Sequence, residues 1–143
     1  MIIDFLVSGM LAGSILVFLA HVAPDVAAGN FVKEFETPRL FGRTLTRREG
    51  HYAGILVHLF QSACSGAAFG WVVESGVARG HLSWAFACLP VVLTCVMGLL
   101  VLPLEGHGYF GVREDAWFPL DLALTNIVWS FLFWGLSAWF VRM

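Results

Sequence analysis

The chain has 143 residues, of which 59% are hydrophobic and only 13% are charged, and its formal net charge is −2 at pH 7. Soluble domains carry about 25% charged residues, and the mean hydropathy of this chain, +0.81, is typical of a protein immersed in lipid. The composition excludes a separate soluble domain and predicts a single membrane domain over residues 1–143. No basic groove and no Gly-rich phosphate loop is indicated, so we expect no nucleic-acid partner.

Four stretches of the chain are long and apolar enough to cross a hydrocarbon core of about 30 Å, which takes about 20 helical residues. They cover residues 5–22, 51–73, 82–104 and 119–141. The first opens with Asp4 instead of a basic cluster and is too long for the apolar run of a typical signal peptide, so we expect it to stay in the protein. The predicted fold is all-α, a polytopic four-transmembrane-helix bundle in a lipid bilayer.

The basic residues fall mostly on one side of this predicted bundle. The loop between the first two spans and the loop between the last two contain Lys33, Arg39, Arg43, Arg47, Arg48 and Arg113. The opposite side has only Arg79 and Arg142. Because loops rich in Lys and Arg stay in the cytoplasm, we expect both termini to lie outside.

The loop between the first two spans contains "FVKEFETPRLFGRTL", residues 31–45, which mixes large apolar side chains with charges. This mixture is typical of helices in the membrane interface, so we expect a short interfacial helical segment here. The next four residues, "TRRE" from Thr46 to Glu49, have the spacing of a capping box directly before an apolar run. They predict that the second long helix begins at this point.

Small residues recur along two of the predicted helices. The second helix has a stripe of small residues at four-residue spacing, which His58 interrupts once: Gly54, Ser62, Gly66 and Gly70. The first helix has a shorter stripe, Gly9 and Gly13. Small side chains let membrane helices approach closely and gain van der Waals contact. The first and second helices are therefore expected to pack tightly against each other.

Polar and ionisable residues gather near the predicted cytoplasmic face. They are His21, His51, His58, His107, Glu105 and Asp121, and Asn126 follows about 7.5 Å further into the fourth helix. A polar residue at membrane depth is a functional hypothesis by default. For Asp121 a structural role is the alternative, since an acid in the first turn of a helix favours the helix dipole.

A metal site is the first function that these residues permit. Zinc or iron needs three or four His or carboxylate ligands at about 2.0–2.2 Å from one ion. His51 and His58 are about 10 Å apart along one helix, so they cannot bind the same ion. The candidate ligands are therefore His51, Glu105 and His107, with His21 as a fourth.

A tetrapyrrole is the second function that they permit. Axial ligation needs one buried neutral imidazole, and a small residue one turn away lets the flat ring approach the helix backbone. His58 follows Gly54 by four residues, which would suit haem b or a chlorophyll-type pigment. Alternatively, His58 hydrogen-bonds across the bundle to Asn126, Thr125, a backbone carbonyl or water. A third interpretation is that it lines a proton or solute path with Asp121 and Asn126.

Several short motifs carry a resemblance to a known family. The string "PRLFG" in the first loop, "GHYAGILVHLF" in the second helix, and a Pro and a His after the third helix resemble a family of small uncharacterised prokaryotic four-helix integral membrane proteins. The resemblance implies the four-helix fold and a place in the prokaryotic cytoplasmic (inner) membrane. It carries no catalytic residue.

The sequence contains no nucleophile elbow, no zincin helix and no pair of acids at catalytic spacing, which favours a protein that is not an enzyme. We therefore hypothesise a non-catalytic accessory or scaffold subunit that packs against other membrane subunits or as a homo-oligomer. The alternative is a tetrapyrrole- or metal-binding electron-transfer component that uses His58. A proton or small-solute conduit is the third hypothesis.

Overall fold

The computed structural model describes residues 1–22, 39–40, 43–77, 81–105, 107–113 and 116–141. Most of these residues belong to four long helices: α1 (Ile2–Val22), α2 (Arg47–Glu74), α3 (Leu82–Val96) and α5 (Phe118–Val141). After Val96 the third helix continues through a π-helical turn, η2 (Met97–Val101), into α4 (Leu102–Glu105). The described part of the chain is therefore helical except for its connections and one short strand pairing.

These helices follow the four predicted spans. The stretches long and apolar enough to cross a membrane are Ile2–Val22, Arg48–Glu74, Leu82–Val101 and Phe118–Phe140. The second helix begins at Arg47 because a capping box precedes it: Oγ1 of Thr46 accepts a 3.3 Å hydrogen bond from the backbone N–H of Glu49, whose carboxylate accepts one of 3.0 Å from the N–H of Thr46. The capping box predicted from "TRRE" is confirmed.

The loop between α1 and α2 differs from its prediction where the structure describes it. Instead of an interfacial helix, β1 (Arg39–Leu40) and β2 (Arg43–Thr44) pair antiparallel, with Arg39 opposite Thr44. Two residues separate the strands, which is the commonest spacing for an antiparallel hairpin. The rest of the predicted interfacial segment, residues 31–38, lies outside the described residues.

A proline explains why α3 does not continue as a regular α-helix to residue 104. Pro103 has no N–H to donate to the carbonyl of Leu99, and in α-helical geometry its ring would collide with that carbonyl. The backbone widens instead, and the N–H of Leu102 donates to the carbonyl of Met97, five residues back. The π-helical turn lets the helix pass the proline without breaking.

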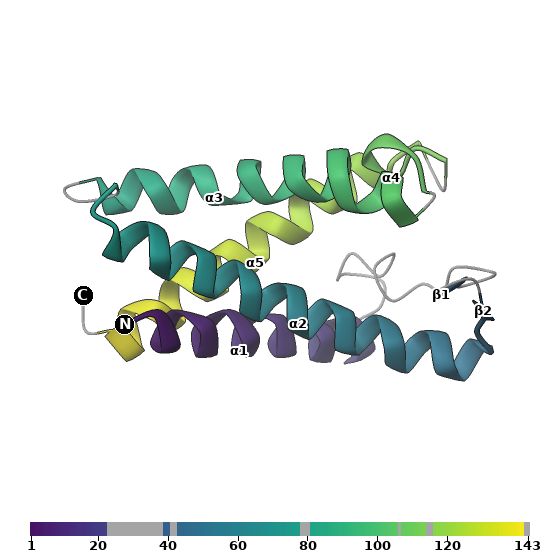
Figure 1. Cartoon of the computed structure of the whole chain (residues 1–143), viewed down its shortest axis with the longest axis horizontal. Helices are drawn as coiled ribbons and strands as arrows, with labels where there is room; N and C mark the ends of the chain where they lie inside the picture. Colours follow the sequence, from purple (N-terminus) through teal and green to yellow (C-terminus); the bar gives the residue numbers. More distant parts are fainter. Residues whose placement is uncertain (23–38, 41–42, 78–80, 106, 114–115, 142–143) are drawn as a thin grey trace.

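The long helices form two antiparallel hairpins, α1 with α2 and α3 with α5 (Figure 1). Contacts are most extensive between α1 and α2, and α5 packs against both α1 and α3. The start of α1 and the end of α5 lie at one end of the molecule, which we call the terminal end. The strands β1 and β2 and the helix α4 lie at the opposite end, which we call the loop end (Figure 1).

An aromatic cluster near the terminal end joins all four long helices. The ring of Phe133 on α5 lies 6.0 Å from that of Phe5, 5.5 Å from that of Phe69 and 5.7 Å from that of Phe86, measured between ring centroids. Trp129 stacks on the same ring at 4.9 Å. Phe133 is fully buried, so it is the central contact between the two hairpins.

A second cluster lies at the loop end and holds the connection between α4 and α5. Leu102, Phe118 and Leu122 are buried there. Phe110, in the 3₁₀ turn η3 (Tyr109–Gly111), packs its ring so closely on Gly98 that a Cβ on that glycine would overlap it. The φ angle of Phe110 is 52°, which is rare for a residue with a Cβ, and this ring packing holds the backbone in the strained conformation.

Candidate functional site

The contact between α1 and α2 is made by glycine backbones. A Cβ on Gly9 would overlap the carbonyl oxygen of Ser62, and a Cβ on Gly66 would overlap the carbonyl oxygen of Phe5. Both glycines are buried. The two helices therefore approach each other as closely as their backbones allow, which is the contact that small residues permit between membrane helices.

The predicted stripe does not contact α1 along its whole length. Gly13 faces the side chain of Ser62, and a Cβ on Gly70 would meet Phe5. Gly54 is exposed, and a Cβ there would meet no described atom within 4 Å. In a helix with 3.6 residues per turn, side chains four residues apart point in directions that differ by about 40°. Five successive positions at this spacing therefore cannot all face one neighbouring helix. Gly54 is the position that has rotated out of the contact.

The ring of His58 reaches toward α1. Its Nε2 lies 3.7 Å from the point where a Cβ on Gly13 would sit, and the side chain is partly buried. A tetrapyrrole bound to this nitrogen would need the space that α1 occupies. The tetrapyrrole hypothesis therefore stays a prediction, and it requires α1 and α2 to separate near Gly13.

Two of the four predicted metal ligands come together. His21 in the last turn of α1 and His51 near the start of α2 approach with their Nε2 atoms 3.1 Å apart. His107 lies in the connection after α4, and the side chain of Glu105 lies outside the described part. Among the described residues, no three His, Cys, Asp or Glu side chains form a group that could hold a metal ion. The larger predicted site is therefore not assembled there.

Asn126 bonds to a residue that the sequence did not indicate. Its Nδ2 donates a 3.1 Å hydrogen bond to Oγ1 of Thr94 on α3, and this hydroxyl donates to the carbonyl of Pro90 at 2.7 Å. Asn126 was one of several alternative partners considered for His58, and in the structure its amide links α5 to α3. Asp121 lies partly buried in the first turn of α5, five residues before Asn126.

Replacing Asn126 with leucine, a residue of similar size, is expected to lower the free energy of unfolding by about 0.6 kcal/mol, the average for hydrogen bonds between membrane helices. The effect is small because the Thr94 hydroxyl keeps its bond to the Pro90 carbonyl. Titration with SDS in mixed micelles measures the change. A loss above about 1.7 kcal/mol, the largest found for such bonds, would contradict this account of Asn126.

An apolar groove runs between residues of α3 and α5 on one side of their contact. Its volume is about 720 Å³, within the range of about 300–1,000 Å³ for pockets that bind ligands. Phe86 and Pro90 line it on α3, and Ile127 and Trp134 line it on α5. Ser130 in its wall is 5% exposed, and its Oγ has no hydrogen-bond partner among the described residues. The groove was not predicted, because its residues look like any other apolar stretch in the sequence.

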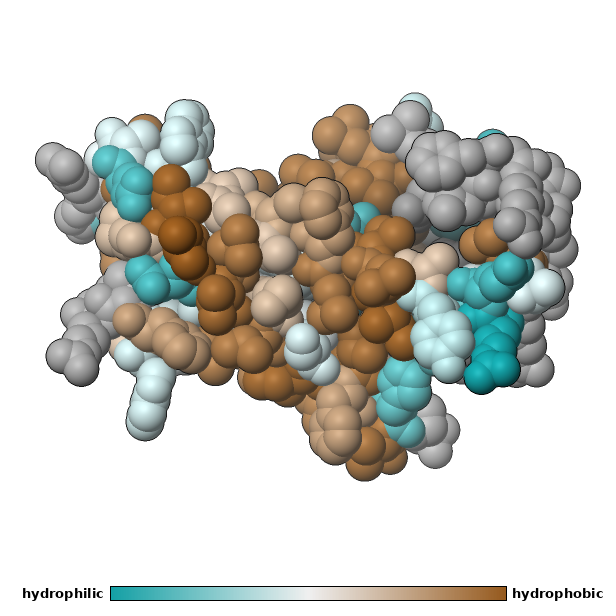
Figure 2. All heavy atoms as spheres, turned by 60° about the horizontal axis from the view of Figure 1, so that its bottom comes forward, coloured by the Kyte–Doolittle hydropathy of each residue, from teal (hydrophilic) through white to brown (hydrophobic). Residues whose placement is uncertain are grey.

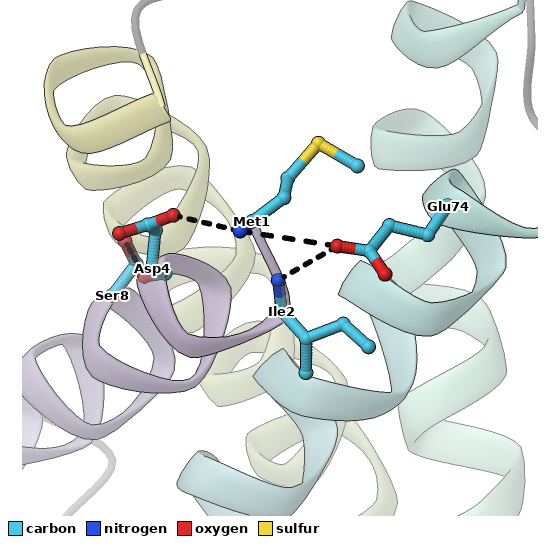
Figure 3. Close-up of polar contacts among 5 residues, drawn as sticks. All are labelled: Met1, Ile2, Asp4, Ser8 and Glu74. Carbon is cyan, nitrogen blue, oxygen red and sulfur yellow. Dashed lines mark hydrogen bonds and ion pairs between the residues drawn. The ribbon is translucent and has the colours of Figure 1, made fainter.

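A polar network joins the terminal ends of α1 and α2 (Figure 3). Oε1 of Glu74 accepts a 3.1 Å hydrogen bond from the backbone N–H of Ile2 and lies 3.8 Å from the ammonium group of Met1. The same ammonium group pairs with Asp4 at 3.1 Å. The charged side chains are 40% and 47% exposed, so each pair contributes at most about 1 kcal/mol. The network closes the hairpin at this end without forming a buried site.

The chain was compared with protein-family models, with curated proteins and with solved structures, and nothing matches. No activity and no residue role therefore comes to this chain from a relative. Its function has to follow from the contacts, burial and shape of the described residues.

Proposed function

We propose that the protein spans the cytoplasmic membrane of a prokaryote, with both termini outside and the loop end in the cytoplasm. A band of hydrophobic surface lies between two more polar ends on the face shown in Figure 2. The four long helices match the thickness of a hydrocarbon core, since 20 helical residues cover about 30 Å. The excess of Lys and Arg in the two predicted cytoplasmic loops supports the orientation.

Within the membrane, we propose that the protein is a non-catalytic accessory or scaffold subunit. The observation that carries this proposal is the groove between α3 and α5, which would receive an apolar helix of another membrane subunit or of a second copy. Its lining includes the small side chains of Ala87 and Ala123 and the exposed aromatic rings of Phe131 and Trp134. Helices in lipid associate by packing side chains into such depressions, because lipid already satisfies apolar surface.

The two other hypotheses are less well supported by this geometry. An electron-transfer role would need a cofactor at His58, whose Nε2 lies against α1 at Gly13. A proton or solute path would need His58, Asp121 and Asn126 to line one channel, whereas the Asn126 amide bonds to Thr94.

The proposal is tested by filling the groove. Ala87→Phe places a large ring among the groove residues, and Ala68→Phe makes the same change at an exposed site on α2. We expect the wild-type chain, extracted in mild detergent, to have the mass of a dimer or of a defined complex by light scattering. Ala87→Phe should weaken this assembly at least about tenfold, equivalent to about 1.4 kcal/mol, and Ala68→Phe should leave it unchanged.

Far-UV circular dichroism and thermal unfolding of both variants control for misfolding. A monomeric wild-type chain without a stoichiometric partner would contradict the proposal. An equal loss of assembly in the two variants would contradict it as well, because the loss would then not depend on the groove.

A further inference from the structure

Two histidines from different helices meet at the loop end of the α1–α2 hairpin. His21 and His51 are 30 positions apart in the chain, and their Nε2 atoms lie 3.1 Å apart. The side chain of His21 is exposed and that of His51 is partly exposed. The pair therefore lies at the surface of the described structure.

The second nitrogen of His21 has a defined role. Its Nδ1 lies 2.7 Å from the carbonyl oxygen of Val17, and a carbonyl only accepts hydrogen bonds, so Nδ1 carries the proton. In the neutral ring, Nε2 of His21 then presents its lone pair toward His51. Histidines that bind metals almost always donate the other ring N–H to a carbonyl or carboxylate in this way, which fixes the tautomer and the orientation of the ring.

We propose that His21 and His51 form a two-histidine site for a divalent transition-metal ion, with water molecules as the remaining ligands. Each metal–nitrogen bond is about 2.0–2.1 Å long, so two nitrogens on one ion lie at most about 4 Å apart. The observed separation of 3.1 Å satisfies this limit. Before binding, Nε2 of His51 carries the proton that lies between the two Nε2 atoms. When the ion takes this place, the proton of His51 is carried on its Nδ1 instead.

The donor set indicates which ions the site takes. Imidazole nitrogen suits Zn²⁺, Cu²⁺ and Ni²⁺, whereas Mg²⁺ and Ca²⁺ prefer oxygen ligands. Among divalent ions of the first transition row, Cu²⁺ binds nitrogen sites most tightly. Because the two histidines belong to the end of α1 and the start of α2, the bound ion closes the loop end of this hairpin. The site is independent of the groove between α3 and α5.

The site is tested with Zn²⁺ and Cu²⁺ added to the purified full-length chain in detergent micelles, after removal of any polyhistidine tag. We expect calorimetry to show one ion per chain. His21→Ala and His51→Ala should each weaken binding at least about tenfold, as expected when a ligand is removed. His81→Ala, at an exposed position before α3, is the matched control and should bind as the wild-type chain does.

The electron paramagnetic resonance spectrum of bound Cu²⁺ counts the nitrogen ligands directly. We expect coupling to two imidazole nitrogens in the wild-type chain and to one in either single variant. Wild-type binding that both variants retain, an equal loss in His81→Ala, or a spectrum without nitrogen coupling would overturn the proposal. A wild-type chain that binds neither ion would overturn it too. None of these results depends on the oligomeric state, so they are distinguishable from a failure of the scaffold proposal.

Discussion

Replacing Phe133 with alanine is expected to lower the free energy of unfolding by about 3 kcal/mol. Phe133 is fully buried and its ring contacts those of Phe5, Phe69 and Phe86. The variant leaves a cavity where four helices meet. This value is at the low end of the range for truncation of buried aromatic residues in water-soluble proteins. In a micelle the unfolded chain stays in apolar surroundings, so the variant loses packing contacts but little free energy of transfer from water.

Titration with SDS in mixed micelles measures this change, and Phe60→Ala is the matched control. Phe60 is 70% exposed on α2, so its truncation removes contacts with detergent or lipid and should change the free energy of unfolding by less than about 0.5 kcal/mol. Equal losses in the two variants would contradict the placement of Phe133 at the centre of the core.

Replacing Gly66 with alanine is expected to destabilise the fold by about 1–3 kcal/mol, as overpacking of a close contact does. The added Cβ would overlap the carbonyl oxygen of Phe5, which is backbone and cannot rotate away. To accept it, α1 and α2 have to move apart along their most extensive contact. The loss occurs even though alanine has the higher helix propensity by about 1 kcal/mol.

Gly54→Ala on the same helix is expected to have the opposite sign. Its Cβ would meet no described atom within 4 Å, so the helix-propensity gain of up to about 1 kcal/mol is not offset by a clash. The same SDS titration measures both variants. If Gly54→Ala destabilised the chain as much as Gly66→Ala, the contact between α1 and α2 would have to include the face of α2 that carries Gly54, which the structure leaves exposed.

The positions of the long helices could be predicted because a membrane imposes a strict requirement on composition. A segment that crosses hydrocarbon needs about 20 apolar residues with all backbone hydrogen bonds made internally. The spans predicted at residues 5–22 and 119–141 differ from α1 and α5 by a few residues at most. The start of α2 was also predictable, because the capping box between Thr46 and Glu49 is a local interaction within four residues.

The side-chain pairings could not be predicted in the same way. Asn126 and Thr94 are 32 positions apart, and their hydrogen bond depends on how α5 crosses α3. His21 and His51 were identified as members of a larger polar group, but their direct contact depends on how α1 and α2 lie side by side. Over residues 39–40 and 43–44 the predicted helical segment is instead a short strand pairing, since apolar and charged residues mixed over a short segment are compatible with either structure.

Hydropathy and local capping were therefore sufficient for the order and approximate positions of the four long helices. They were not sufficient for the faces through which the helices touch. A helix in a water-soluble protein reveals its buried face by a polar face opposite to it, but a helix in lipid is apolar all round and lacks that signal. Gly54 and Gly66 look equivalent in the sequence, and only the crossing of α1 and α2 separates the exposed glycine from the buried one.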